Sequence, residues 1–410
     1  MERIDVVVVG GGQAGLAASH ELSERGIEHM VLERGRVGQS WRGRWDSFCL
    51  VTPNWSMQLP GGPYDGDDPD GYLPRDEIVG YLEGYASANA GPVREGVEVT
   101  SIRDVAAGGF ELDTSSGAIG AREVVLASGA YQRSYQPPGV EGFPGELAVL
   151  ALSDYTNVAA LPPGRVLVIG SGQSGCQIAE ELHEAGREVF LACGRAPWVQ
   201  RRVGGHDIFW WILEIGFMAM PLSALPDPVA GRLESNPLAT GHGGGHDLHL
   251  RTLRAMGVTL LGHFEGAGDG LARFSQDLGD IVAWGDQRHL QLMGLIRKTA
   301  AERGIELEDL ESPSPFDPPS PATLDLAGFG AVILTGGFRP DYRSWLPWAD
   351  AFDDLGFPIQ RDGASTVVPG LSFVGVHFMR TRKSSLLIGV GEDAAIVAAA
   401  IAARRANGPS

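Results

Sequence analysis

Two short glycine-rich segments have the residue types and the spacing that bind the phosphates of a dinucleotide. The first runs from Gly10 to Gly15 as G-x-G-x-x-G, and the second repeats this pattern from Gly170 to Gly175. In such a loop the first glycine allows a tight turn, the second lets the backbone approach a pyrophosphate, and the third lets a helix pack on a strand. The free N–H groups at the start of that helix then face the phosphates. The sequence therefore predicts two dinucleotide sites.

The residues beyond each loop separate the two sites. Glu33 follows Gly12 by about 20 residues, where a carboxylate accepts hydrogen bonds from ribose hydroxyls and repels a 2′-phosphate. Cys193 holds the equivalent position in the second unit, with Arg195 two residues later and Arg201 close behind. Guanidinium groups there favour a 2′-phosphate. The second site is therefore predicted to bind NADPH, unless Arg195 is an ordinary surface arginine.

Regular elements must position these loops, and their pattern repeats along the chain. The first set has strands at residues 4–9 and 28–32 and a helix at 16–24; the second has strands at 165–169 and 188–192 and a helix at 177–184. Each set is a βαβ unit, so we expect a parallel sheet in both halves of an α/β protein. Further strands are predicted at 123–127, 331–334 and 371–376, a last helix at 392–405, and loops at 60–74 and 311–322.

The composition restricts the class of protein. At about 150 residues per domain, 410 residues allow two or three domains. A net charge of −19 argues against nucleic acid or an anionic membrane surface as the main partner. The three cysteines form no C-x-x-C pair, which excludes the redox pair of a disulfide reductase and a cysteine zinc site. Since no apolar run approaches the ~18 residues of a membrane span, we expect a soluble, cytoplasmic protein without stable membrane insertion, and a homodimer stays open.

Motifs outside the glycine loops carry a resemblance over nearly the whole chain. They are Gly38-Gln39-Ser40-Trp41, Leu50-Val51-Thr52-Pro53, Leu126-Ala127-Ser128-Gly129-Ala130-Tyr131, Phe143-Pro144-Gly145, Ser153-Asp154-Tyr155 and Leu334-Thr335-Gly336-Gly337-Phe338-Arg339-Pro340. In this order they resemble the class B flavin-dependent monooxygenases, a group of flavin-containing monooxygenases, YUCCA-like enzymes and Baeyer–Villiger enzymes. The resemblance is weakest over residues 201–311.

The resemblance implies two Rossmann-like dinucleotide-binding domains. An FAD domain would be formed by both chain ends, at residues 1–160 and 325–410. An NADPH domain would be inserted between them at 161–324, with a variable substrate-side insertion at about 200–311.

The same resemblance assigns residues to the two cofactors. These are Gly10, Gly12, Gln13, Ala14, Gly15, Glu33, Arg34, Gln39, Ser40, Trp41, Val99, Ser128, Gly129, Gly170, Ser171, Gly172, Gln173, Ser174, Gly175, Arg195, Arg201, Thr335, Gly336, Leu386 and Asp393. The first loop and Glu33 would hold FAD, and the second loop NADPH. Val99 would offer backbone bonds to the adenine, and the helix start at Asp393 would stabilise negative charge on the reduced flavin. A turn or cap without ligand is the alternative for Val99 and Asp393.

The implied reaction is an NADPH-dependent oxygenation. NADPH would reduce FAD, O₂ would form a flavin C4a-(hydro)peroxide, and one oxygen atom would pass to a small, partly apolar nucleophile such as an amine nitrogen, a thioether sulfur or an electron-rich ring. The alternatives are a non-oxygenating NADPH-dependent flavin reductase or dehydrogenase, and a nucleotide-binding redox sensor without turnover. The family's linker signature contains a histidine, but Ala151 stands there if Tyr155 closes the signature, which weakens a Baeyer–Villiger assignment.

Four features remain with two interpretations each. Asn54 is a candidate for the asparagine that some family members place beside the flavin, or an ordinary turn residue. His377 is a catalytic candidate near the flavin by family position, or a core histidine. The aromatic segment 206–222 could line a substrate entrance or a membrane surface, or form a buried helix or dimer contact. The histidines in residues 242–249 resemble zinc ligands, but the glycines between them preorganise poorly, so a loop over the active site is expected and no metal.

Overall fold

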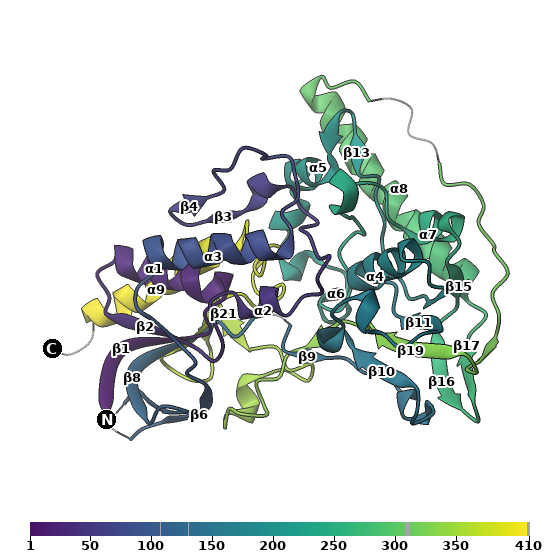
Figure 1. Ribbon diagram of the computed structural model, residues 1–410. Coiled ribbons are helices and arrows are strands. Elements are labelled where there is room, and N and C mark those ends of the chain that lie inside the picture. Colours follow the sequence, from purple (N-terminus) through teal and green to yellow (C-terminus); the bar gives the residue numbers. More distant parts are fainter. Residues whose placement is uncertain (107, 130, 308–311, 408–410) are drawn as a thin grey trace.

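The computed structural model describes residues 1–106, 108–129, 131–307 and 312–407. Ala130 of the motif at 126–131 lies outside the described residues, as do 308–311 of the expected insertion and loop and 408–410 of the expected last domain segment. The chain forms two halves that lie side by side, each built on a sheet with helices packed on it (Figure 1). The α/β architecture predicted from the sequence is confirmed.

The first sheet takes strands from both ends of the chain, in the order β21-β22-β23-β8-β1-β2-β5. Their bounds are β1 (Glu2–Val9), β2 (His29–Glu33), β5 (Val93–Glu95), β8 (Ile119–Leu126), β21 (Gln360–Arg361), β22 (Ala364–Ser365) and β23 (Leu371–Phe373). β1 pairs in parallel with β2 and β8, and β8 in parallel with β23. β6 (Val99–Asp104) and β7 (Phe110–Thr114) continue from β8 as antiparallel strands. The carboxyl ends of β1, β8 and β23 therefore meet at one edge.

The second sheet has the order β10-β19-β11-β12-β15, and each neighbouring pair is parallel. Its strands are β10 (Ala148–Ala151), β11 (Arg165–Ile169), β12 (Val189–Ala192), β15 (Thr259–Leu261) and β19 (Phe329–Leu334). This corrects the expected domain boundaries, because β10 and β19 fall within 1–160 and 325–410 and yet pair in the sheet of β11. A short apolar run has the same appearance in either of two buried parallel sheets, so its own residues do not reveal its sheet.

The helices pack on the two sheets through their apolar faces. Alternate side chains of β1 enter different cores: Val6 and Val8 pack under α1 (Gln13–Glu24), α3 (Arg75–Asn89) and α9 (Val390–Asn407), and Val7 and Val9 face the opposite layer. On the second sheet, α4 (Gln173–Glu184), α7 (Leu250–Met256) and α8 (Leu278–Arg303) share one core. Each glycine loop is thereby fixed between a buried strand and a buried helix.

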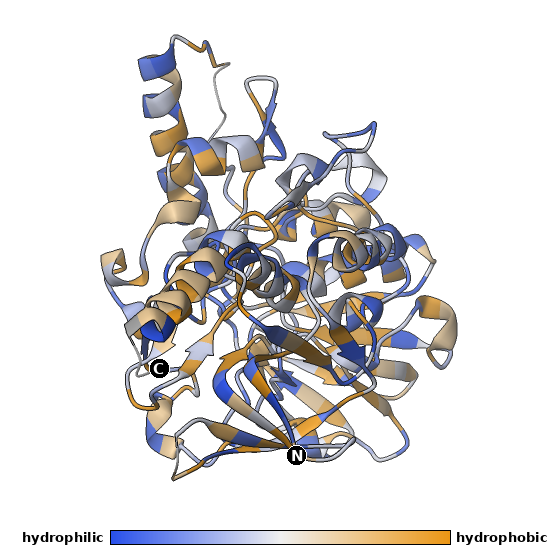
Figure 2. Ribbon diagram, turned by 90° about the vertical axis from the view of Figure 1, so that its left-hand side faces the viewer, coloured by the Kyte–Doolittle hydropathy of each residue, from blue (hydrophilic) through white to orange (hydrophobic). Residues whose placement is uncertain are grey.

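The remaining elements connect or edge these layers. They are α2 (Gln39–Arg42), α5 (Ile208–Glu214), α6 (Pro228–Gly231), β3 (Gln58–Leu59), β4 (Gly62–Pro63), β9 (Arg133–Ser134), β13 (Arg202–Val203), β14 (His206–Asp207), β16 (Phe264–Gly268), β17 (Leu271–Phe274), β18 (Thr323–Asp325) and β20 (Phe338–Arg339). Hydrophilic and hydrophobic turns alternate along α8, the helix at the top of Figure 2. Among the described residues, no helix has the length and apolarity needed to cross a membrane.

Candidate functional site

The two glycine loops have the same conformation, at the carboxyl ends of β1 and β11. Gly10 and Gly170 have φ angles of 112° and 111°, which residues with a side chain rarely adopt. A Cβ on Gly15 would lie 1.8 Å from the Gly10 carbonyl oxygen, and a Cβ on Gly175 would lie 1.8 Å from that of Gly170. These four positions therefore require glycine so that each helix can begin directly against its strand.

Open space lies over the start of each helix. A Cβ on Gly12 or Gly172 would meet no atom within 4 Å, and neither N-cap has a side-chain capping bond. The first turns of α1 and α4 contain no acidic residue, so nothing there offsets the positive end of the helix dipole. Each glycine loop with the helix start that follows it is here called a cradle: the first at residues 10–15, the second at 170–175. Both cradles therefore fit the pyrophosphate of a dinucleotide, whose oxygens would accept hydrogen bonds from the free N–H groups.

Each loop is tied to its next strand by a different side chain. Glu33 is 7% exposed and accepts hydrogen bonds from the N–H groups of Gly11 (2.6 Å) and Gly35 (2.8 Å). Its two oxygens offer further lone pairs, which ribose hydroxyls could use. In the second loop the Ser171 hydroxyl donates to the Gly194 carbonyl (2.9 Å) and accepts from the Gly194 N–H (3.0 Å). The second loop therefore needs no carboxylate at the end of β12.

Arg195 and Arg201 lie in unlike surroundings. Arg195 is exposed beyond β12 and makes no ion pair with any residue that the structure describes. Arg201 is 2% exposed, and its guanidinium lies 2.7 Å from the Asp207 carboxylate and donates to the Val51 carbonyl (2.7 Å) and the Tyr72 hydroxyl (3.0 Å). The expectation that Arg201 binds the 2′-phosphate is therefore wrong, because its guanidinium is buried and already neutralised.

Segments far apart in the sequence converge at the start of α1. The Trp41 indole N–H donates to Gln13 Oε1 (2.8 Å), and Gln13 Nε2 donates to the Ser385 carbonyl (3.2 Å). Gly375 follows β23 so closely against the helix that its Cβ would lie 2.4 Å from that of Ala14. The structure thus brings together three motifs assigned to the flavin from different parts of the chain.

Unpartnered polar atoms lie beside this convergence, at the start of α9. Asp393 is 1% exposed and pairs with Arg380 at 2.6 Å, and burial raises the pKa of its carboxyl. Its Oδ2 and the hydroxyl of Ser385 are buried without a partner among the described residues, and Leu386 beside them is half-buried. Buried polar atoms are rarely left unpaired, so these atoms fit the edge of a bound flavin. The assigned role of Asp393 stays a prediction.

Most other assigned residues follow the strand ends. Ser128 and Gly129 follow β8 after one intervening residue, and Thr335 and Gly336 come directly after β19. The Thr335 hydroxyl donates to the Gly170 carbonyl (2.7 Å), so this pair belongs to the second cradle. Gln173 bonds the backbone of Ala239, and Ser174 is half-buried in the first turn of α4. Arg34, Gln39 and Ser40 lie exposed at or near α2.

Val99 is less close to the first cradle than its neighbour Val97. Val99 is half-buried at the first position of β6 and pairs with Thr114. The Val97 N–H, in contrast, donates to the Glu33 carbonyl (2.9 Å). Val97 was not predicted as a site residue, although it lies only two positions before Val99, a single step of strand alternation. The adenine contact assigned to Val99 stays a prediction.

The two catalytic candidates differ in their surroundings. Asn54 is 1% exposed; its Nδ2 donates to the Asp68 carbonyl (2.8 Å) and its Oδ1 accepts from the Leu73 N–H (2.7 Å). Both ends of its amide therefore hold the loop at residues 68–73, as in the interpretation of Asn54 as an ordinary turn residue, and its catalytic candidacy stays a prediction. The proline and glycine residues of that loop leave its carbonyls and N–H groups without regular partners, which a buried amide then satisfies.

His377 lies two residues beyond Gly375, on the segment that reaches α1. Burial, together with the charges of Arg382 and Arg232, lowers the pKa of its imidazole to about 4. The ring is therefore neutral at pH 7. Its catalytic candidacy stays a prediction.

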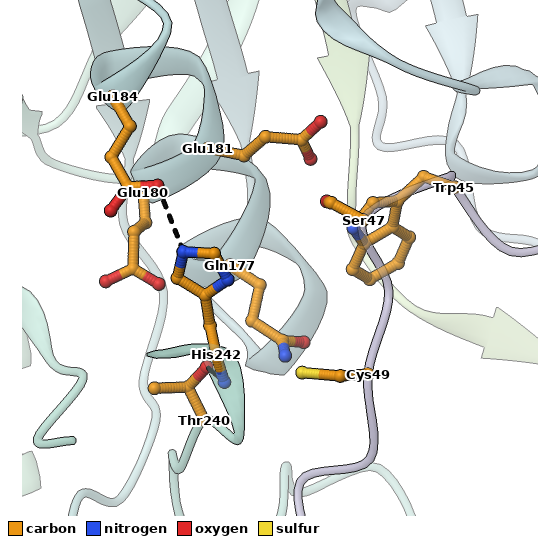
Figure 3. Close-up of a pocket in the computed structure, with 9 residues that line it drawn as sticks. All are labelled: Trp45, Ser47, Cys49, Gln177, Glu180, Glu181, Glu184, Thr240 and His242. Atoms are coloured by element: carbon orange, nitrogen blue, oxygen red, sulfur yellow. Dashed lines mark hydrogen bonds and ion pairs between the residues drawn. The ribbon is translucent and has the colours of Figure 1, made fainter. Parts of the chain in front are cut away.

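A pocket opens between the two halves of the molecule (Figure 3). It is lined by Trp45, Ser47 and Cys49 after α2, by Gln177, Glu180, Glu181 and Glu184 of α4, and by Thr240 and His242. His242 pairs with Glu184 at 3.1 Å, and His246 with Glu180 at 2.7 Å. The carboxylates disfavour a nucleotide phosphate here, so the pocket borders the second cradle without extending it. Among the described residues, no group of three His, Cys, Asp or Glu is placed to hold a metal ion.

The aromatic segment 206–222 forms a buried helix contact. Within it, α5 packs its buried residues Phe209 and Trp211 into a core with α8. The Phe209 ring also lies 5.6 Å from that of Trp55, and the Lys383 N–H donates to the Met218 carbonyl (3.2 Å). This packing follows the buried-helix interpretation, and it joins the inserted segment to the chain just before α9.

Comparison with known proteins gives relatives over nearly the whole chain. A family model described as pyridine nucleotide-disulphide oxidoreductase matches residues 7–206. An uncharacterized CzcO-like oxidoreductase of Geobacillus kaustophilus is 32% identical over 95% of this chain and 96% of its own length. An indole-3-pyruvate monooxygenase of rice, YUCCA4, is 28% identical over 56% of this chain and 60% of its own.

Solved structures have the same fold. A flavin-containing monooxygenase from Stenotrophomonas maltophilia has a TM-score of 0.68 and 22% identity, covering 99% of this chain and 100% of its own. A bacillithiol disulfide reductase from Bacillus cereus has a TM-score of 0.64 and 15% identity, with 98% and 100% covered. The fold is thus common to oxygenating and disulfide-reducing flavoproteins, and the site must decide between these activities.

Proposed function

The chain belongs to the class B flavin-dependent monooxygenases, and from that premise we propose that it inserts one oxygen atom of O₂ into a small, partly apolar nucleophile. It is an oxidoreductase with FAD and NADPH as cofactors. The proposed acceptor is an amine nitrogen, a thioether sulfur or an electron-rich ring. O₂ and the acceptor are the remaining reactants.

The observation that carries this proposal is that the two cradles differ where the ribose of a dinucleotide would lie: the first has a carboxylate there and the second does not. Glu33 places a buried carboxylate beside the first cradle, which suits the unphosphorylated ribose of FAD. At the second cradle Ser171 replaces that carboxylate as the tie, and the exposed Arg195 follows β12. This difference supports FAD in the first site and NADPH in the second.

A bound flavin would supply the redox chemistry, accepting reducing equivalents from NADPH and passing oxygen to the substrate. The chain's own residues would orient the ring and exclude water. Trp41 and Gln13 form a bonded chain to Ser385, which fixes the wall on which the ring would lie. The first turn of α9, which begins shortly after Ser385, carries the acidic residues Glu392 and Asp393, so stabilisation of the reduced ring by this helix start stays a prediction.

The cysteines argue against disulfide reduction. Reductive thiol chemistry needs a thiolate, which forms when surroundings lower a cysteine pKa. Here burial raises the pKa of Cys49, raises that of Cys193 to about 12, and raises that of Cys176 well above its ordinary value. The Cys176 thiol also donates to the Ser171 carbonyl (3.3 Å), as a structural side chain does.

Isotope labelling tests the proposal. The holoenzyme would be supplied with NADPH, ¹⁸O₂ and a panel of amines, thioethers and indoles. One ¹⁸O atom per product molecule, with one NADPH consumed, is the expected result. NADPH consumption that yields only hydrogen peroxide across the panel would instead support the non-oxygenating reductase.

A further inference from the structure

A buried guanidinium lies without a counter-ion near the proposed flavin site. Arg382 is 5% exposed and forms no ion pair with the residues that the structure describes. Its Nη1 donates to Asn236 Oδ1 at 3.3 Å, and its Nε is buried without a partner. The ring centroids of Phe217 and Phe378 lie 4.5 and 5.0 Å from its Cζ atom. The exposed Glu234 attracts this charge only at longer range.

A second guanidinium belongs to the same cluster. Arg232 lies with its Nη1 2.7 Å from the Asp353 carboxylate, and its Nε is also buried without a partner. The hydroxyl of Ser235 is a third buried group without a partner among the described residues. The charges of both arginines lower the pKa of His377. Asp353 neutralises Arg232, so the cluster presents several unpaired donors and, in Arg382, one guanidinium without a counter-ion among the described residues.

The cluster lies where the inserted segment meets the flavin-side chain. His377 follows Gly375, which contacts α1 at Ala14, and the Arg382 N–H donates to the Met220 carbonyl (3.2 Å). The opposite side of the cluster comes from α6 and the residues after it, and α6 lies between the two halves in Figure 1. Phe378 has a φ of 50°, a conformation that costs free energy for an aromatic residue. That backbone turn directs the Phe378 ring under the Arg382 guanidinium.

We propose that Arg382, with the unpaired Nε of Arg232 as a further donor, binds the carboxylate of an anionic organic substrate; the two arginines are here called the arginine clamp. The inference rests on the proposed function, since it names the substrate class of that site. A buried cation with unpaired donors is destabilising, and a carboxylate supplies both the charge and the acceptors. A cationic amine would be repelled, and a neutral one would leave the donors unpaired.

The rest of the substrate would meet an aromatic surface. Phe217 and Phe378 flank the clamp, and the core around α5 lies on the side of Phe217. The cofactor phosphates have their own cradles at the starts of α1 and α4, so the clamp is left for a different anion. The predicted substrate is therefore a small aromatic or aliphatic acid whose oxidisable atom lies away from the carboxylate.

Calorimetric binding to the FAD-loaded enzyme tests the clamp without requiring turnover. Benzoate, phenylacetate and hexanoate would each be compared with the corresponding amide. Wild type should bind at least one acid roughly 10-fold to 100-fold more tightly than its amide. Arg382→Met should bind acid and amide alike. Arg343→Met is the matched control, because Arg343 donates to the Phe352 carbonyl (2.7 Å) outside the clamp, and it should keep the preference.

A second variant guards against simple loss of folding. Asn236→Asp keeps the shape of the residue but places a carboxylate on Arg382, so it should abolish the preference for acids while FAD content and NADPH affinity stay at wild-type values. No preference in wild type, or a preference that survives in Asn236→Asp, would overturn the inference. So would loss of FAD or NADPH binding in both variants, which would assign the guanidinium to a cofactor. Because binding is measured without oxygen transfer, failure of the proposed oxygenation leaves this result readable.

Discussion

At the scale of single residues, the two cradles differ in the side chain that hydrogen-bonds each loop to the end of its next strand. Glu33 ties the first loop with a carboxylate, whereas Ser171 ties the second with a neutral hydroxyl. A carboxylate both accepts from ribose hydroxyls and repels a 2′-phosphate, so its replacement changes which nucleotide can bind. The exposed Arg195 then lies where a phosphate could pair with it.

Replacing Arg195 should alter the choice between the two nicotinamide cofactors. Arg195→Ala should weaken NADPH binding by about 1–3 kcal/mol relative to NADH, because only NADPH carries the phosphate that the guanidinium would pair with. Dissociation constants of both cofactors measure this. Arg187 precedes β12 as Arg195 follows it, so Arg187→Ala is the control that should leave the ratio unchanged. Equal weakening of NADPH and NADH in Arg195→Ala would show that Arg195 does not contact the phosphate.

Glycine roles could be predicted from the sequence, and side-chain partners could not. The conformation of Gly10 and the close approach at Gly15 follow from the motif itself. Arg201 stands near Arg195 in the sequence, but the β13–β14 hairpin returns Asp207 to it, which only the folded chain reveals. The hydrogen-bond partners of Asn54 could not be predicted for the same reason, since they come from a loop more than ten residues away.

At the scale of elements, Arg201 fastens the second half to the first. It contacts Asp207 on β14 and, across the junction, Tyr72 and the Val51 carbonyl. The Tyr72 hydroxyl also donates to Asp207 (2.6 Å), so the three side chains form one buried network. Removing one member of such a network leaves the others buried and unpaired.

The network should matter for stability and not for cofactor choice. Arg201→Met should lower the free energy of unfolding by about 3–5 kcal/mol, because Asp207 would remain as an unpaired buried charge. Tyr72→Phe should cost only about 1–2 kcal/mol. Denaturant unfolding measures both, and Arg202→Met on the exposed neighbour should change little. If Arg201→Met weakened the binding of NADPH but not of NADH, Arg201 would contact the 2′-phosphate after all.

The start of α7 should make the protein sensitive to acid. His249 is 8% exposed, caps α7 and contacts Trp198 at a ring-centroid distance of 4.5 Å; burial lowers its pKa from 6.5 to about 4. Between those values the unfolded chain binds more protons than the folded one, so stability is complete above pH 6.5 and is lost as the pH falls towards 4. The loss should reach about 2–3 kcal/mol.

His249→Asn tests that assignment, because asparagine can cap a helix but does not titrate. Unfolding free energies between pH 7 and pH 4 should fall less steeply in this variant than in wild type. His183→Asn on α4 is the matched control and should keep the wild-type slope. Part of the slope should remain, since burial also lowers the pKa values of His29, His289 and His377. An unchanged slope in His249→Asn would contradict the assignment.

Elements with strong periodicity could be predicted, and elements in the inserted region could not. Residues 165–169 form β11 as expected, whereas the helices after the two loops begin at Gln13 and Gln173, three and four residues before the expected starts at 16 and 177. The long helix α8 went unnoticed, because Gly285 and His289 occupy positions on its buried face while Leu290 and Leu295 are exposed, which obscures its apolar stripe. The strand β10 could not be predicted from its own sequence either, since its four apolar residues form a strand only by pairing with β19.

At the scale of the whole molecule, the chain crosses between its halves more often than a simple insertion requires. β10 and β19 bring both sides of the crossing into the second sheet, next to β11. The residues after β19 then return to the first sheet at β21, β22 and β23. We therefore place the domain boundaries near residues 147 and 337 in preference to 160 and 325. The chain after β19 therefore runs from the second cradle to the segment containing Ser385, on which the flavin ring would lie.

The central claim is that reduced flavin in this chain passes oxygen to a substrate. Stopped-flow mixing of the NADPH-reduced enzyme, with NADP⁺ still bound, against O₂ tests it most directly. If oxygen is transferred, we expect a transient absorbance spectrum that differs from the spectra of oxidised and reduced flavin. Its decay should become faster when an oxidisable substrate is present. Direct return to oxidised flavin in one step, at a rate that no substrate changes, would contradict it.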